Sequence, residues 1–182
     1  GVTPPWVAVS LNGTHAYVSN SGGDTVSVIN TATNTVTNTV AVGSYPYGVA
    51  VSPNGDFVYV ANYYGDSVSV IDTATNTVIR TIPVGSRPWG VAVGPDDNLV
   101  YVTNTGDNTV SVIHTATTTV TATQVGSFPN GVAVSPDGTH TYVTNTGGNS
   151  VAVITNSAAD LVGGNGGDGG NAGAVGNGGV GG

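Results

Sequence analysis

Three short segments of this 182-residue chain recur at one shared spacing, and this repetition limits the fold more than any other feature. The segment Val-Ala-Val-Ser begins at Val7 and returns at steps of 42, 42 and 41 residues, with Gly replacing Ser once. A Tyr-Val-x-Asn tetrad starting at Tyr17 and a Val-Ser-Val-Ile run starting at Val26 return at the same steps, the last run as Val-Ala-Val-Ile. A common period in three separate segments indicates four equivalent structural units.

Each unit is predicted to contain four short β-strands. The repeated segments are rich in Val and Thr, whose β-branched side chains suit a pleated sheet better than a helix. In the first unit we expect strands at residues 7–10, 17–20, 26–29 and 35–42. The dipeptide Asn12-Gly13 between the first two strands is typical of a tight hairpin, and Asn54-Gly55 and Asp137-Gly138 recur in its place.

A period near 42 residues with four strands per unit is typical of the blades of a β-propeller. The tetrads at 101–104 and 142–145, both Tyr-Val-Thr-Asn, resemble the YVTN family of β-propeller repeats, as does the run at 66–72. The resemblance covers about residues 4–155. It implies an all-β fold of four-stranded antiparallel blades. The family is usually seven-bladed and occurs in surface-layer and other exported proteins.

The repeats and a glycine-rich tail divide the chain into two regions. We expect a propeller region at 1–162 and a tail at 163–182, with blades at about 4–45, 46–87, 88–128 and 129–162. The last blade lacks the segment that would form a fourth strand. Four blades of a fold that usually has seven predict an open arc, although closure into a small ring is the alternative. The chain begins at Gly1 without Met, so we expect a processed product or an internal part of a longer protein.

The tail is expected to be disordered, because 12 of its 20 residues are Gly and have no side chains to bury. Its Gly-Gly-x triplets resemble the glycine-rich region of mycobacterial PE-PGRS proteins, which implies a cell-envelope protein. Residues 163–168 also fit the start of a calcium-binding nonapeptide repeat, but only one copy is present and such repeats need stacked neighbours.

Charge is scarce: the chain has two Arg, ten Asp and a net charge of −8. Nucleic-acid binding requires a dense cationic surface, so we expect no nucleic-acid partner. The absence of Cys excludes disulfides and thiolate chemistry. No apolar run approaches the roughly 20 residues that span a bilayer, so no transmembrane segment is expected.

The titratable residues favour structural roles. His15 and His140 share a repeat position that elsewhere holds Phe57 or Leu99, which indicates packing, and His114 lies in a turn. Asx residues recur just before the third strand of each unit and at the end of each tetrad, which predicts capping of backbone N–H groups. The only adjacent acidic pair, Asp96-Asp97, replaces the hairpin Asn-Gly. We therefore predict no catalytic residues, no metal site and no cofactor.

Aromatic residues gather in the connections that should emerge on one rim of the propeller. The candidate rim patch consists of Tyr45, Tyr47, Tyr63, Tyr64, Arg87, Trp89 and Phe128. Tyr, Trp and Arg are enriched at binding hot spots, so these residues could bind a protein or a glycan. The alternative is that some of them pack between neighbouring blades.

These patterns favour a non-enzymatic, exported repeat module that acts as a cell-envelope scaffold or as a protein or glycan interaction surface. The expected location is extracellular or in the cell envelope. The expected partners are a protein or glycan at the cell surface, copies of the chain itself, or further blades of a longer parent chain. The alternative is a fragment of a lactonase-like or quinoprotein-like propeller enzyme whose catalytic residues lie outside this chain.

Overall fold

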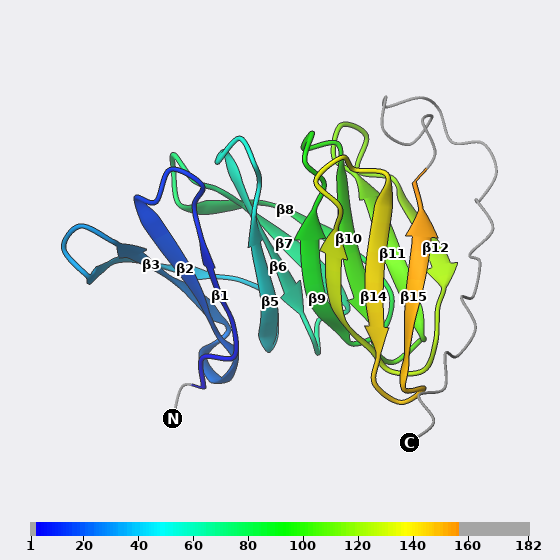
Figure 1. Ribbon diagram of the computed structural model, residues 1–182. Coiled ribbons are helices and arrows are strands. Elements are labelled where there is room, and N and C mark those ends of the chain that lie inside the picture. The colour runs from blue at the N-terminus through cyan, green and yellow to red at the C-terminus, as the bar shows by residue number, and fades with distance from the viewer. Residues whose placement is uncertain (1–2, 157–182) are drawn as a thin grey trace, which may run out of the picture.

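The computed structural model describes residues 3–156, which form fifteen strands in four antiparallel sheets (Figure 1). Within each sheet the strands are neighbours in chain order. The first sheet contains β1 (Val7–Val9), β2 (His15–Asn20), β3 (Thr25–Asn30) and β4 (Thr35–Ala41). The second contains β5 (Pro46–Val51), β6 (Phe57–Asn62), β7 (Ser67–Asp72) and β8 (Thr77–Pro83). The third contains β9 (Pro88–Val93), β10 (Leu99–Asn104), β11 (Thr109–His114) and β12 (Val120–Gln124). The fourth contains β13 (Pro129–Val134), β14 (His140–Asn145) and β15 (Ser150–Thr155).

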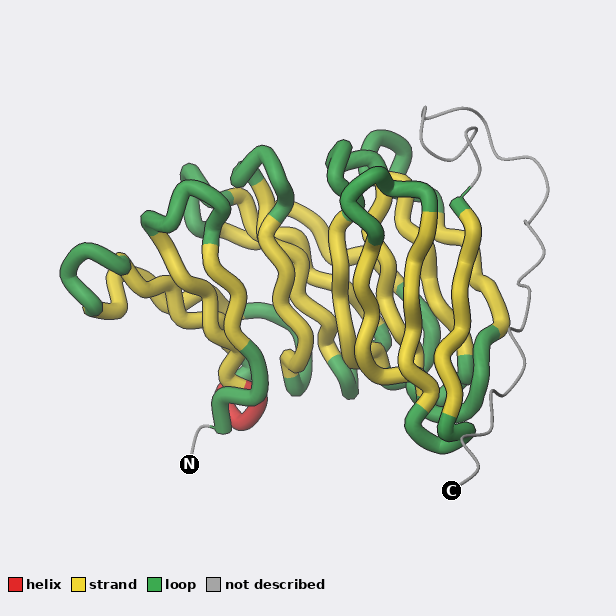
Figure 2. Tube along the Cα trace, viewed as in Figure 1, coloured by secondary structure: helices red, strands yellow, loops and turns green. Residues whose placement is uncertain are grey.

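The predicted all-β propeller architecture is confirmed. The four sheets stand in a row that does not close on itself, as expected for an open arc (Figure 1). Loops connect the strands at both ends of every sheet, and a short 3-10 helix, η1 (Ser21–Gly23), occupies one loop of the first sheet (Figure 2). The predictions for the glycine-rich tail at 163–182 and for the boundary at 162 lie outside the described residues.

Turn chemistry explains where the first hairpin of each sheet reverses. Gly13, Gly55 and Gly138 occupy the turn position with φ of 70°, 83° and 73°, a left-handed conformation that Gly adopts without steric cost. Asp97 occupies the same position in the third sheet with φ 64°. Asp is among the few residues other than Gly that adopt this conformation, so the hairpin forms without Gly.

One extra residue in the outer strand accounts for the change of step from 42 to 41. The β3–β4 register shifts between Val28 and Ile29, and the β7–β8 register shifts between Val70 and Ile71. The β11–β12 register runs without a shift. Each shift marks a β-bulge, in which one strand carries an additional residue. The third outer strand lacks that residue, so the next repeat arrives one position earlier.

The sheets are held together by apolar residues between them. The innermost strands β1, β5, β9 and β13 contact one another in turn, while the outermost strands diverge. In the wedge between the second and third sheets, Tyr59, Val68 and Val70 pack with Val100 and Val102. Full burial of a Val side chain contributes about 1.5–3 kcal/mol, so the interfaces between sheets supply much of the stability.

Neighbouring sheets approach so closely that the inner strand needs Gly. A Cβ at Gly48 would lie 2.4 Å from the Trp89 carbonyl oxygen of the next sheet, and a Cβ at Gly90 would lie 2.4 Å from the Asn130 carbonyl oxygen. The first sheet carries Trp6 at this repeat position. In the first sheet the inner strand β1 has only three residues, whereas β5 has six. Because β1 begins at Val7, Trp6 lies before the strand.

The outer faces of the first and last sheets lack a neighbour in the described structure. The repeat tyrosines Tyr17, Tyr59 and Tyr101 are 2%, 5% and 1% exposed, whereas Tyr142 is 46% exposed. Val151 is likewise 50% exposed, although its counterparts in the other three sheets are fully buried. At the opposite end, Val7 and Val9 are exposed on the first sheet. Both ends of the arc therefore present apolar side chains.

Candidate functional site

The candidate rim patch lies on loops that acidic or amide side chains hold in place. Each loop between sheets contains a residue in the left-handed region: Tyr45 at φ 56°, Arg87 at 53° and Phe128 at 52°. An Asx side chain of the preceding sheet accepts a hydrogen bond from each of these backbone N–H groups. The pairs are Asp24 Oδ1 with Tyr45 N at 2.7 Å, Asp66 Oδ1 with Arg87 N at 2.8 Å, and Asn108 Oδ1 with Phe128 N at 2.9 Å. The predicted capping role of these Asx residues is confirmed, and it acts between sheets.

Five aromatic rings of the predicted patch come together. The aromatic cluster consists of Tyr45, Tyr47, Tyr63, Tyr64 and Trp89. The rings of Tyr47 and Trp89 have centroids 4.1 Å apart, and those of Tyr45 and Tyr64 are 4.8 Å apart. These two pairs are tilted, whereas Tyr63 makes edge contacts with Tyr64 and Trp89. Edge contacts contribute about 0.5–1.5 kcal/mol per pair beyond area burial. The cluster joins the second sheet to the third, because Trp89 belongs to β9.

A β-bulge positions two of these rings. The pairing of β5 with β6 shifts by one residue between Pro46 and Val49, the segment that holds Tyr47. The pairing of β9 with β10 shifts where Trp89 lies. Bulges redirect a side chain relative to the regular strand alternation. The same irregularity occurs in three successive sheets, and in the second and third it lies at Tyr47 and Trp89, whose rings are in contact.

The aromatic cluster combines packing with exposure. Tyr45, Tyr47, Tyr63 and Trp89 are half-buried, whereas Tyr64 is 64% exposed. Burial, followed by the charges of the neighbouring tyrosines, raises the pKa of Tyr47. The hydroxyl is neutral at pH 7, as in an ordinary tyrosine, and can donate a hydrogen bond. The inner rings therefore pack in the junction, as the packing alternative expects, whereas Tyr64 faces solvent.

Arg87 and Phe128 lie on the same rim but outside the aromatic cluster. Phe128 is exposed and packs beside Gly147 of its own sheet, where an added Cβ would lie 2.9 Å from the Phe128 ring. The carbonyl of Arg87 accepts hydrogen bonds from the N–H and hydroxyl of Thr105 at 3.0 and 2.9 Å. The structure thus brings together five of the seven predicted patch residues.

The tetrad asparagines differ from the prediction. We expected them to cap backbone N–H groups, but their side-chain amides donate to hydroxyls of the adjacent strand. Asn104 Nδ2 lies 2.9 Å from both Thr109 Oγ1 and Ser111 Oγ. Its Oδ1 is buried without a hydrogen-bond partner among the described residues. Gly85 explains the burial, since a Cβ there would lie 2.5 Å from Asn104 Nδ2.

The described residues contain no group of three metal-ligating side chains. His15 and His140 make matching contacts in the first and fourth sheets, with Thr14 at 2.9 Å and Thr139 at 2.7 Å.

Over residues 3–156, no helix has the length and apolar character needed to cross a membrane.

Sequence reasoning missed a cavity of about 310 Å³ between the second and third sheets. It lies at the rim opposite to the aromatic cluster, where the first and last hairpins of each sheet emerge, and Arg80 and Asp97 contribute to its lining. The one sequence signal that could have pointed to the cavity was Asp97, which replaces the Gly of the equivalent hairpin turns.

Known structures contain the same architecture. A chain of hydrazine synthase from Kuenenia stuttgartiensis superposes with a TM-score of 0.80 at 33% identity, covering 84% of this chain and 46% of that one. A provisionally assigned 6-phosphogluconolactonase from Bacteroides fragilis gives 0.77 at 18% identity, with 87% and 52% covered. A catalytically inactive virginiamycin B lyase from Staphylococcus aureus gives 0.74 at 20% identity, with 85% and 53% covered. The chain thus spans about half the length of these solved chains.

Sequence patterns agree with the structural comparisons. The NHL repeat pattern matches residues 86–113. No curated protein matches the chain in sequence. The pattern of the YNCE-like beta-propeller family matches residues 2–99, which is more than half of the chain. The protein therefore belongs to the YNCE-like β-propeller family.

Proposed function

We propose that this chain is a non-enzymatic interaction module of an exported propeller protein, acting at the cell envelope, and that the aromatic cluster contacts a protein or glycan. The observation that carries the proposal is the contact of five aromatic rings on one rim, with Tyr64 64% exposed. Rings that are held by their neighbours offer a large contact area at small entropic cost.

The chemistry of the aromatic cluster suits an uncharged or weakly polar partner. Its rings offer flat apolar faces, and its tyrosine hydroxyls offer donors and acceptors. Sugar rings present C–H faces and hydroxyls in the same combination. Export is inferred from the YVTN resemblance and agrees with the scarcity of charged residues, which make up 7% of the chain.

The test is binding of the chain to an array of bacterial surface glycans and envelope proteins, repeated with single alanine variants. Tyr64→Ala should weaken binding at least tenfold and leave the melting temperature unchanged, because Tyr64 is mainly exposed. Leu11→Ala is the control, an exposed apolar residue in the hairpin between β1 and β2, outside the aromatic cluster and both end faces. Equal binding by wild type and Tyr64→Ala would contradict the proposal. A large loss of stability in Tyr64→Ala would assign the ring to packing.

We further propose that the open end faces are assembly surfaces, covered by further blades of a longer chain or by a second copy. This proposal rests on Tyr142 and Val151, which keep residue types that are buried in the other sheets. Within the arc, the same positions pack against the next sheet in chain order. Sedimentation velocity tests it: wild type should self-associate with rising concentration, and Tyr142→Asp should remain monomeric. A compact wild-type monomer at all concentrations would exclude the second copy.

A second candidate function is that of a part of a propeller enzyme whose catalytic residues lie elsewhere. It is favoured by the 33% identity with a hydrazine synthase chain over 84% of this chain. An activity screen of the longer protein, including lactone hydrolysis, would support this candidate if turnover persists after Tyr64→Ala. Absence of turnover on every substrate tried would favour the interaction module.

A further inference from the structure

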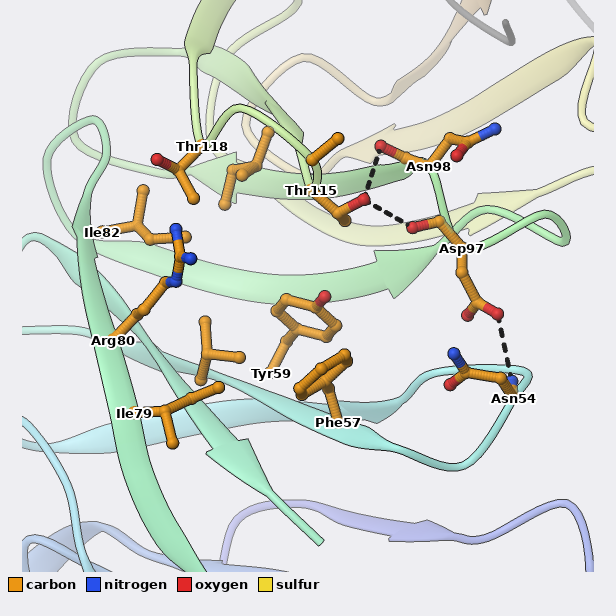
Figure 3. Close-up of a pocket in the computed structure, with 13 residues that line it drawn as sticks. Asn54, Phe57, Tyr59, Ile79, Arg80, Ile82, Asp97, Asn98, Thr115 and Thr118 are labelled. Atoms are coloured by element: carbon orange, nitrogen blue, oxygen red, sulfur yellow. Dashed lines mark hydrogen bonds between the residues drawn. The ribbon is translucent and has the colours of Figure 1, made fainter. Parts of the chain in front are cut away.

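The cavity between the second and third sheets collects residues that depart from the repeat. It is lined by side chains of β6, β7 and β8 and by the hairpins of the third sheet (Figure 3). Its volume of about 310 Å³ is at the lower end of the range for small-molecule sites. The lining residues without a matching residue type in the other units include Phe57, Ile79, Arg80 and Asp97.

Asp97 occupies a turn position that favours Gly. The equivalent residues are Gly13, Gly55 and Gly138, all with positive φ. A left-handed conformation costs a residue with a Cβ roughly 1 kcal/mol relative to Gly. Asp is among the few other residues that adopt this conformation. Asp97 therefore keeps the turn and adds a carboxyl group at the cavity, where the equivalent turns have no side chain.

The β-bulge of the second sheet shapes the opposite side of the cavity. The register of β7 with β8 shifts at Ile71, so that Val70 faces Arg80 and Ile71 faces Val78. Ile79 is the additional residue of this bulge. It is 47% exposed yet lines the cavity. Arg80, one of only two cations in the chain, pairs with Val70 as Asn38 pairs with Val28 in the first sheet.

Positive and negative groups lie at opposite ends of the cavity, with aromatic rings between them. Figure 3 shows the guanidinium of Arg80 on one side, the carboxyl group of Asp97 on the other, and the rings of Tyr59 and Phe57 between. No ion pair joins Arg80 to Asp97 in the part of the chain that is described here. The exposed guanidinium of Arg80 can pair with a carboxylate, and the carboxyl group of Asp97 has capacity for a further hydrogen bond.

Burial shifts the pKa values of two residues that line the cavity, Asp97 and Tyr59. Burial raises the pKa of Asp97, an effect that the backbone N–H of Asn54 partly offsets and that Asp56 and Asp96 reinforce. Asp97 Oδ2 accepts a hydrogen bond from Asn54 N at 3.2 Å, while its Oδ1 is buried without a partner among the described residues. Burial raises the pKa of Tyr59 to about 12, so its hydroxyl remains neutral.

We propose that this cavity binds a small aromatic acid that carries a hydrogen-bond donor at the end opposite to its carboxylate. The carboxylate pairs with the guanidinium of Arg80, the ring lies against Phe57 and Tyr59, and the donor reaches the carboxyl group of Asp97. A carboxylate and a guanidinium form the strong, charge-assisted type of hydrogen bond. A flat ring suits these walls, because contacts between aromatic rings are stabilising beyond the area that they bury.

The test uses 3-(4-hydroxyphenyl)propionate as the probe in isothermal titration calorimetry with the intact chain. Two comparison compounds each lack one group: 3-phenylpropionate lacks the donor, and 4-hydroxyphenethyl alcohol lacks the carboxylate. We expect millimolar or tighter binding of the probe and at least about tenfold weaker binding of both comparison compounds, because each leaves one charged group of the cavity unpaired. No detectable probe binding, or equal binding of all three compounds, would overturn the proposal.

Three variants assign the binding to the cavity. Arg80→Gln should weaken probe binding at least about tenfold while leaving the affinity for 4-hydroxyphenethyl alcohol unchanged. Asp97→Gly should weaken probe binding without lowering the melting temperature, since it restores the repeat residue. Arg87→Gln, at the other rim, is the matched control and should bind as wild type does. Equal losses in Arg80→Gln and Arg87→Gln would contradict the assignment. If Asp97→Gly fails to fold, 3-phenylpropionate still tests Asp97 from the ligand side.

Discussion

The junction between the second and third sheets and the outer face of the fourth sheet carry the same repeat residues, but the exposure of these side chains differs sharply. At the junction, Tyr59 is 5% exposed and Val68 is fully buried; at the outer face, their equivalents Tyr142 and Val151 are 46% and 50% exposed. The difference comes from the neighbouring sheet, since the residue types are the same. These positions therefore contribute to stability only where a sheet lies against them.

The same comparison separates residues that recur in every sheet, and build the fold, from residues that occur at a single junction. The outer face of the fourth sheet keeps the repeat residues. The junction keeps them in its interior but departs at both rims, with Tyr64 and Trp89 at one and Arg80 and Asp97 at the other. Departures that converge from separate segments onto one junction indicate a site, because the repeat alone does not require them.

The largest expected contrast is between two tyrosines of the same repeat position. Tyr59→Ala should lower the free energy of unfolding by about 3–5 kcal/mol, because it leaves a void in the packed wedge. Tyr142→Ala should cost less than about 1 kcal/mol in the monomer, where water already reaches the ring. Urea unfolding of dilute protein measures both values. Similar losses in the two variants would mean that the fourth sheet is covered as well.

Two glycines provide the next contrast. In Gly48→Ala the new Cβ would meet the Trp89 carbonyl at 2.4 Å, and the backbone would have to separate. We expect a loss of roughly 1–3 kcal/mol, as for other overpacked sites. In Gly131→Ala the nearest atom is the hydroxyl of Thr144 at 3.0 Å, within the same sheet. Its melting temperature should fall less than that of Gly48→Ala, and the reverse order would contradict the close approach.

A smaller contrast concerns a hydrogen bond between sheets. Thr103 Oγ1 donates to the Asn130 carbonyl of the next sheet at 2.8 Å and accepts from Gly90 N at 2.9 Å. Thr103→Val should therefore cost roughly 1–2 kcal/mol, since it leaves buried groups unpaired. Thr144 Oγ1 is exposed and, within residues 3–156, bonds only within its own sheet, accepting from Gly131 N at 2.9 Å and donating to Gly131 O at 3.4 Å. Thr144→Val should change the unfolding free energy by less than about 0.5 kcal/mol, and equal costs would refute the role of the neighbouring carbonyl.

The smallest expected effect is a difference in pH dependence between two hairpin carboxyls. Burial raises the pKa of Asp97 in the folded state, so its contribution to stability grows as pH falls from neutral and is complete below the ordinary Asp value. Hydrogen bonds from Ser135 and Thr139 hold the pKa of Asp137 at about 2, so its contribution is present at neutral pH and is lost as pH falls toward 2. Urea unfolding between pH 7 and 2 measures both effects. Asp97→Asn should remove a rise in the free energy of unfolding as pH falls, and Asp137→Asn should remove a decrease.

Much of the fold could be predicted from the sequence, because the residues that determine the strands and turns recur at the same positions of each repeat. Val, Tyr and Asn at fixed positions define the strands, and Gly13 and Gly55 define the hairpins. The aromatic cluster could also be anticipated, since Tyr64 and Trp89 stand in connections that propellers place on one rim. That prediction included Arg87 and Phe128, because sequence position alone does not determine which way a loop side chain turns.

The cavity could not be predicted, because its parts are separated in sequence and its shape depends on a bulge. Arg80 and Asp97 lie on different sheets, and one added residue, Ile79, decides how the β8 side chains face β7. The tetrad asparagines were also misjudged, since a terminal Asn can cap a backbone or bind a neighbouring hydroxyl. Only the adjacent strand decides between these, through Thr109 and Ser111 beside Asn104.

The central claim is that repeated residues build the propeller, whereas the departures at the second junction form its sites. The most direct measurement is probe binding by calorimetry to a variant that restores repeat residues in the cavity, Phe57→Leu, Arg80→Asn and Asp97→Gly, with its melting temperature recorded alongside. The account predicts a melting temperature no lower than that of wild type and no binding of 3-(4-hydroxyphenyl)propionate. Undiminished binding in a folded variant would contradict the claim.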